Sequence, residues 1–231
     1  MDNRGAWPNQ ALPHRHFNWQ NHADDLIEAI ETRYQQPVIG MGHSIGGTVT
    51  ALAALKRPDL FTKLVLIDAA STPSKFISMM TANSPQWLAF KLFKFIKRTH
   101  HRRKIWPSRQ AFVANYQHHP TYRLFTEQAF ADYAQHGLLE RDDGQFELAF
   151  NPHWESFNFR KVHFLWDALN KTTHPTLLLR AEHSYMYSQT RFEELNRNLP
   201  DNINAHTITG AHHLVSHEMP DALATQIQAW I

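Results

Sequence analysis

The chain has 231 residues, of which 42% are apolar and 19% charged, and its net charge is +2 with histidine neutral. These values exclude a disordered chain, and the small net charge gives no general attraction to nucleic acid. The absence of cysteine excludes a disulfide framework and thiolate chemistry. Because no apolar run approaches the roughly 18 residues of a membrane span and the first residues lack the apolar stretch of a signal peptide, we expect a cytoplasmic protein.

The first part of the chain predicts a loop followed by a strand–helix–strand unit. Residues 19–34 have apolar positions at helical spacing, and residues 62–70, "TKLVLIDAA", form an almost continuous apolar run. Such a run is typical of a parallel strand that is covered on both faces. The predicted elements are a loop at 1–16, a helix at 19–34, a strand at 37–42, a helix at 46–58 and a strand at 62–70.

The composition and the spacing of apolar residues change after this unit. Residues 71–165 are rich in Phe, Trp, Lys and Arg, with helix-like spacing at about 86–97 and 122–135 and no strand alternation. Strand and helix patterns then return, with strands at 174–183 and 203–213 and helices at 188–199 and 220–231. The sequence therefore predicts an α/β fold with a parallel sheet, in which a core of residues 1–70 and 166–231 carries a mostly helical insertion at 71–165.

A serine lies between four glycines at the junction of a predicted strand and a predicted helix. Gly42-His43-Ser44-Ile45-Gly46 is a G-x-S-x-G pentapeptide. This arrangement predicts a sharp turn that lifts the serine above the sheet, with small residues where strand and helix nearly touch. The backbone N–H of Ile45 would then lie at a helix N-terminus, where unpaired amides favour negative charge. We expect Ser44 to be a nucleophile and the Ile45 amide to be half of an oxyanion hole.

A serine hydroxyl needs a base to take its proton, and the candidates lie in "TGAHHLVSHEMP" near the C-terminus. His213 is our choice, with His212 as the alternative.

At this point the chain resembles the α/β-hydrolase family of serine hydrolases and esterases. The resemblance rests on "VIGMGHSIGG", "LVLIDAA", "PTLLLRAEHS" and "GAHHLV" in this order and spacing, and covers most of the chain. It implies a helical cap at 71–165, a Ser-His-acid triad and hydrolysis of an apolar carboxylic ester with no metal or organic cofactor.

The acid of the triad departs from the family pattern. The position where the family usually has an aspartate aligns with Tyr185, and a tyrosine cannot hold an imidazolium as a carboxylate does. Asp68, at the end of the strand after the nucleophile helix, is the expected substitute, because some family members use that position. Glu182 is the other option, and a purely structural role for Asp68 stays open.

The front of the chain departs as well, because "DNRG" at residues 2–5 resembles the family's loop after its fourth strand. The earlier strands and the loop that gives the second oxyanion amide would then lie upstream of Met1. We therefore expect a truncated or mis-started version of a longer hydrolase, with the edge of strand 37–42 exposed.

Two other functions compete with the esterase. A dinucleotide-binding fold would use Gly40, Gly42 and Asp68, but Ile45 occupies the place of its third glycine. The other is a catalytically impaired relative that binds a ligand or partner. It is favoured by Tyr185 at the usual acid position and by the expected absence of the N-terminal strands and the oxyanion loop.

The remaining features concern surfaces. The run 91–104 is strongly basic and indicates either a solvated face with its aromatics packed inward, which is the commoner case, or docking on an anionic membrane. Histidine pairs such as His100-His101 have no carboxylate at ligand spacing, so we expect packing or surface roles and no metal site. The oligomeric state is not readable from the sequence.

Overall fold

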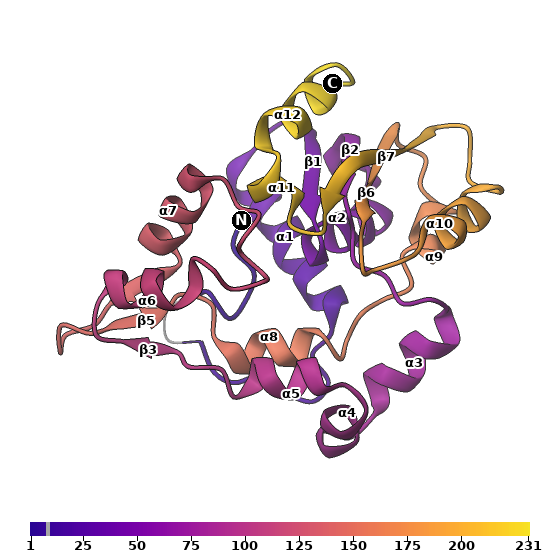
Figure 1. Cartoon of the computed structure of the whole chain (residues 1–231). Coiled ribbons are helices and arrows are strands. Elements are labelled where there is room, and N and C mark those ends of the chain that lie inside the picture. The colour runs from indigo at the N-terminus through magenta and orange to yellow at the C-terminus, as the bar shows by residue number, and fades with distance from the viewer. Residues whose placement is uncertain (8–9) are drawn as a thin grey trace.

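The computed structural model describes residues 1–7 and 10–231. Its main sheet has four parallel strands, as the sequence predicted, and their order is β1-β2-β6-β7. Figure 1 shows this sheet in the upper half of the molecule, with α1 and α2 behind it. The strands are β1 (Val38–His43), β2 (Phe61–Ile67), β6 (Thr176–His183) and β7 (Ile203–His212).

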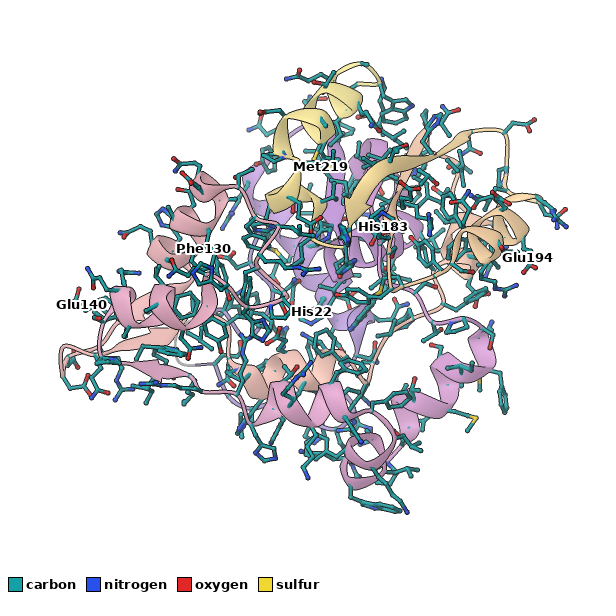
Figure 2. All side chains as sticks on the ribbon, viewed as in Figure 1. His22, Phe130, Glu140, His183, Glu194 and Met219 are labelled. Atoms are coloured by element: carbon teal, nitrogen blue, oxygen red, sulfur yellow. The ribbon has the colours of Figure 1, made fainter. Side chains whose placement is uncertain are left out.

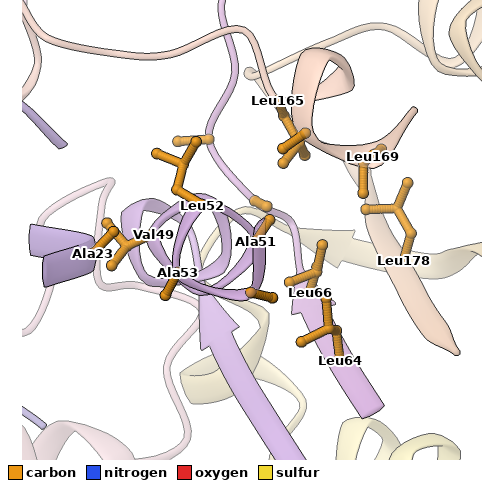
Figure 3. Close-up of a cluster of buried hydrophobic side chains, with 14 of the residues drawn as sticks. Ala23, Val49, Ala51, Leu52, Ala53, Leu64, Leu66, Leu165, Leu169 and Leu178 are labelled. Atoms are coloured by element: carbon orange, nitrogen blue, oxygen red, sulfur yellow. The ribbon is translucent and has the colours of Figure 1, made fainter. Parts of the chain in front are cut away.

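The helices of this half pack on both faces of the sheet. They are α1 (Trp19–Arg33), α2 (Ile45–Lys56), the 3-10 turn η1 (Pro58–Leu60), α9 (Trp166–Leu169), α10 (Gln189–Asn196), α11 (Val215–Glu218) and α12 (Pro220–Gln228). Alternate residues of β2 point to opposite faces. Leu64 and Leu66 join a cluster with α1, α2 and α9 (Figure 3), whereas Val65 and Ile67 join a cluster with α12. Burial on both faces explains the continuous apolar run of this strand.

Strand β1 forms one edge of the four-stranded sheet. It pairs with β2 along one side, and no other described strand pairs with β1. Ile39 and Met41 are 43% and 50% exposed although both are large and apolar. The structure therefore presents an open strand edge at this point.

The segment between β2 and α9 lies along the left and lower sides of the molecule in Figure 1. Its elements are α3 (Lys75–Asn83), α4 (Gln86–Leu92), α5 (Lys94–His100), β3 (Ile105–Trp106), α6 (Arg109–Tyr116), α7 (Glu127–His136), β4 (Leu138–Glu140), β5 (Phe146–Leu148) and α8 (Pro152–Asn158). The Ser71 hydroxyl accepts a hydrogen bond from the Leu165 amide at 3.0 Å, so the two ends of the segment meet. The cap boundaries of 71–165 stay our proposal.

The sequence showed no strand alternation in this segment, but the structure has three short strands within it. Strands β3, β5 and β4 form a small antiparallel sheet around Trp106, Leu138 and Leu148. Each strand has only two or three residues, which is too short for alternation to show. The available signal was the Asp143-Gly144 pair between β4 and β5, where Gly144 has a φ of +75°.

The predicted helix at 86–97 is two helices that break at Phe93, and the one at 122–135 begins later, at Glu127. The later start follows from the cap, because the Thr126 hydroxyl accepts a hydrogen bond from the Ala129 amide.

A buried polar contact joins the two halves of the molecule. The His22 ring on α1 lies 3.2 Å from the amide oxygen of Asn158 at the end of α8. His22 lies near the centre of the molecule, where these two helices meet (Figure 2). Burial lowers the pKa of His22, so this contact is formed by a neutral ring.

Candidate active site

Ser44 lies at the turn between β1 and α2, with a φ of +53° and a ψ of −122°. A Cβ added to Gly42 would lie 2.3 Å from the backbone of Gly46, so strand and helix do nearly touch here. At Gly46 an added Cβ would meet nothing within 4 Å, so the expectation of tight packing was wrong for that glycine. The second close approach is at Gly47, against Ala69. The tight turn is thus maintained by Gly42 and Gly47.

The structure brings Ser44, His213 and Asp68 together from three separate parts of the chain. His213 Nε2 lies 3.0 Å from Ser44 Oγ, and His213 Nδ1 lies 2.6 Å from Asp68 Oδ2. Asp68 is fully buried and His213 is 5% exposed. Because a carboxylate only accepts, Nδ1 carries the proton that it donates to Asp68, and Nε2 is free to accept from the Ser44 hydroxyl.

Asp68 follows directly after β2, and its carboxylate is fixed by the end of β6. Oδ1 accepts from the Ala181 amide at 3.0 Å, and Oδ2 accepts from the Ser184 hydroxyl at 2.8 Å. Together with the bond from His213 Nδ1, these bonds engage both carboxylate oxygens and hold the side chain in one orientation. Among the described residues, the non-glycine residues with positive φ are Ser44 and Asp68, at +53° and +37°. Backbone strain is therefore concentrated at these two positions.

The alternative acid Glu182 and the alternative base His212 contact other residues. The Glu182 carboxylate accepts a hydrogen bond from the Gly210 amide at 2.6 Å. The Nδ1 atom of His212 lies 3.7 Å from the Glu218 carboxylate, and the His212 side chain is 43% exposed. The structure therefore brings neither Glu182 nor His212 into the hydrogen-bonded chain.

The amide of Ile45 begins α2, a helix of 12 residues. The first amides of a helix have no partner within it, and the helix dipole makes them attractive to an anion. Ile45 follows Ser44 directly, so its N–H is the first amide of the helix, as the expected oxyanion donor requires.

Two residues of the site were missed by sequence reasoning. His43 Nε2 donates to the backbone carbonyl of His213 at 2.6 Å, and burial next to His213 lowers the pKa of His43 to about 4. The ring of Tyr185 lies 4.6 Å from that of His213, while the residue is 73% exposed. Tyr185 thus covers the outer side of the imidazole. The sequence signal for His43 was its place inside the pentapeptide, which indicated proximity but no partner.

A model of the Alpha/beta hydrolase family matches residues 1–226 of the chain. The chain belongs to this family. Solved structures agree on the fold of this alpha/beta hydrolase. E-2-(acetamidomethylene)succinate hydrolase superposes with a TM-score of 0.73 at 22% identity, over 96% of this chain and 76% of that chain. A Mycobacterium tuberculosis esterase gives a TM-score of 0.70 at 19% identity, over 98% and 74%.

The curated relatives match shorter stretches of this alpha/beta hydrolase. A type I acyl-CoA thioesterase of Penicillium brevicompactum is 29% identical over 99 residues, which are 42% of this chain and 21% of that protein. A probable esterase of Oryza sativa subsp. japonica is 36% identical over 56 residues, 24% of this chain and 21% of that protein. The aligned part of the chain thus spans about a fifth of either relative.

Two observations concern a metal or a dinucleotide. Within residues 1–7 and 10–231, no group of three His, Asp or Glu side chains is close enough to hold a metal ion. Asp68, which a dinucleotide-binding fold would need for a ribose, is occupied by His213 and Ser184.

Proposed function

We propose that this alpha/beta hydrolase is a serine esterase that cleaves an apolar carboxylic ester through a Ser44–His213–Asp68 triad and an acyl-enzyme. The observation that carries the proposal is the continuous hydrogen-bonded chain from the Ser44 hydroxyl through His213 to the buried Asp68 carboxylate. Serine, imidazole and carboxylate in this order can activate a nucleophile on many folds, because the roles depend on geometry.

In the first half of the reaction, Ser44 Oγ attacks the carbonyl carbon of the ester while His213 Nε2 takes its proton. The oxygen that gains negative charge is stabilised by the Ile45 N–H. His213 then donates the proton to the leaving alcohol, the carbon–oxygen bond breaks, and the acyl group stays on Ser44.

In the second half, a water molecule attacks the acyl carbon and gives its proton to His213. The acid is released when that proton returns to Ser44 Oγ. Asp68 accepts the hydrogen bond from the Nδ1–H of His213 throughout and balances the charge of the imidazolium.

A thioester is the second candidate substrate. The match to the acyl-CoA thioesterase covers 42% of this chain, and the same attack would release a thiol in place of an alcohol. A cytoplasmic location and a small-molecule ester as the partner stay predictions.

The test compares the protein with its Ser44→Ala variant on p-nitrophenyl esters from acetyl to dodecanoyl and on acyl-CoA thioesters. A fluorophosphonate probe is applied in parallel. We expect ester cleavage and probe labelling that are both lost in Ser44→Ala. A folded protein that shows neither would contradict the esterase and favour a homologue that binds a ligand or partner without cleaving it.

A further inference from the structure

Helices α3, α4 and α5 follow one another along the lower border of the molecule, away from the main sheet (Figure 1). They expose an unusual number of large apolar side chains, each at 47% or more: Phe76, Met79, Met80, Trp87, Leu92 and Phe95. Single exposed apolar residues are normal on a protein surface, whereas contiguous apolar groups mark interaction sites. These six lie within one stretch of 20 residues. We call these three helices the α3–α5 face.

The same part of the chain carries only one sign of charge. No Asp or Glu occurs between Asp68 and Glu127, whereas ten Lys and Arg do. Those after α5 are partly neutralised, since Arg102 pairs with Glu155 and Lys104 with Glu147.

The charges on α4 and α5 themselves are left without partners. Within the described residues, no ion pair is formed by four exposed cations: Lys91, Lys94, Lys97 and Arg98. The sequence indicated a face with its aromatics packed inward, but in this run only Ile96 is fully buried, and Leu92 and Phe95 are exposed. Exposed apolar and exposed cationic side chains therefore occur together on the same two helices.

A cavity of about 650 Å³ adjoins the turn between α3 and α4 and is bounded on the other side by α8. Its wall holds six basic or imidazole side chains and no carboxylate of the described residues: Arg15, His16, His100, His153, Arg160 and Lys161. Lys161 is 9% exposed and its ammonium donates only to two backbone carbonyls, of Ala82 and Arg15, at 2.7 and 3.2 Å. The buried Nε of Arg160 has no partner. A buried cation without a counter-charge is costly, so the cavity favours an anion.

We propose that the α3–α5 face binds the surface of an anionic phospholipid bilayer, with its apolar side chains in the headgroup region and a headgroup phosphate in the adjoining cavity. Aromatic and aliphatic side chains gain free energy at that depth while lysines reach out to anionic headgroups. An arginine fork suits a phosphate oxygen pair.

The contact is peripheral, because no helix in the described part of the chain is long and apolar enough to cross a bilayer. A second copy of the chain fits less well, since two such faces would bring their unpaired positive charges together.

The test is sedimentation with vesicles of phosphatidylcholine alone and of phosphatidylcholine with phosphatidylglycerol, at low and at high salt. We expect binding to the anionic vesicles at low salt, and its loss at high salt. The double variant Lys91→Gln/Lys94→Gln should bind about fivefold more weakly for each charge removed. Its control is Arg33→Gln/Lys171→Gln, two exposed cations of the other half, which should bind like the unmodified protein.

The apolar part is tested by Phe76→Ser/Trp87→Ser, which should bind about tenfold more weakly. The matched control is Tyr34→Ser/Leu139→Ser, which removes side chains of similar exposure elsewhere. Thermal unfolding of each variant shows that its fold is intact.

Three results would overturn the proposal. One is the absence of binding to anionic vesicles at low salt, and another is an equal loss in the variants and their controls. The third is a concentration-dependent dimer that Phe76→Ser/Trp87→Ser abolishes, which would make a second copy the occupant. If Arg160→Gln leaves vesicle binding unchanged, the cavity does not hold a headgroup phosphate.

Discussion

The Nε2 atom of His43 donates a hydrogen bond to the backbone carbonyl of His213 at 2.6 Å, and the two rings lie 4.9 Å apart. The residue just before the proposed nucleophile thus holds the backbone of the proposed base. His43 can donate from Nε2 in its neutral form, which its lowered pKa of about 4 favours near pH 7. The turn that exposes Ser44 and the loop that carries His213 are therefore tied to each other.

Replacing His43 should impair catalysis although His43 itself is not expected to contact the substrate. In His43→Leu the carbonyl of His213 loses its donor and the imidazole is held less precisely, so we expect kcat to fall about tenfold with KM little changed. The more conservative His43→Gln can still donate and should retain more activity. A change in KM alone would show that His43 contacts substrate instead.

The protein should lose stability in mild acid. Burial lowers the pKa of His22, His163 and His43, and that of His43 falls from its usual 6.5 to about 4. Well above pH 6.5 these rings are neutral in both the folded and the unfolded chain, so their titration does not change the free energy of unfolding.

As the pH falls from about 6.5 towards 4, the unfolded chain takes up protons that the folded chain does not, and unfolding becomes easier. For His43 the loss amounts to about 3 kcal/mol. Urea unfolding at pH 7.5, 6 and 5 measures it, and His43→Gln should show a shallower dependence. An unchanged midpoint across this range would contradict neutral burial of the three rings.

Asp68 and Glu182 can be distinguished as the triad acid by a matched pair of substitutions. Asp68→Asn keeps the shape of the side chain but removes the charge that balances the imidazolium, so kcat should fall by about 10⁴. Glu182→Gln should leave kcat within about twofold, because Glu182 bonds to the Gly210 amide. The reverse result would assign the role to Glu182.

The backbone at Ser44 should be relieved by glycine. At a φ of +53° and a ψ of −122°, an L side chain is strained whereas glycine is not. Ser44→Gly should therefore be about 1 kcal/mol more stable than Ser44→Ala, while both are inactive. The comparison is made by urea unfolding, and equal stability of the two variants would show that the turn stores no strain.

The two glycines of the pentapeptide should respond differently to alanine. A Cβ at Gly42 would overlap the backbone of Gly46, so Gly42→Ala should lower the free energy of unfolding by about 3 kcal/mol or more. Gly46→Ala meets no atom within 4 Å and lies in a helix, where alanine is the better helix former. Equal effects of the two substitutions in thermal unfolding would contradict the geometry of the turn.

The α/β core was predictable because its signals are local and mutually consistent. The buried strand β2 reads as one apolar run, and the turn at Ser44 requires glycine at Gly42. The positions of Asp68 and His213 at the ends of strands were also predictable, because parallel strands bring their carboxyl ends to one edge of the sheet.

The rest depends on contacts between distant parts of the chain. Nothing local indicates that Glu182 bonds to Gly210 or that His43 reaches the carbonyl of His213. The strands β3, β4 and β5 are stabilised by packing around Trp106 and not by their own pattern. The exposed side chains of α3 and α4 look like core residues in sequence, and only the tertiary structure shows that they are uncovered.

The position of Asp68 also bears on how this enzyme could diversify. Its carboxylate comes directly after β2 and accepts from the Ala181 amide near the end of β6 and from the Ser184 hydroxyl just after it, so that part of the chain supplies only two small polar contacts. Position 185 therefore does not need a carboxylate to balance the imidazolium charge. It has a tyrosine instead, whose ring lies next to the His213 imidazole. Under the proposed triad, substitutions at position 185 can change which substrates reach Ser44 while Ser44, His213 and Asp68 are retained. Substrate selectivity could therefore change at this position without loss of the catalytic residues.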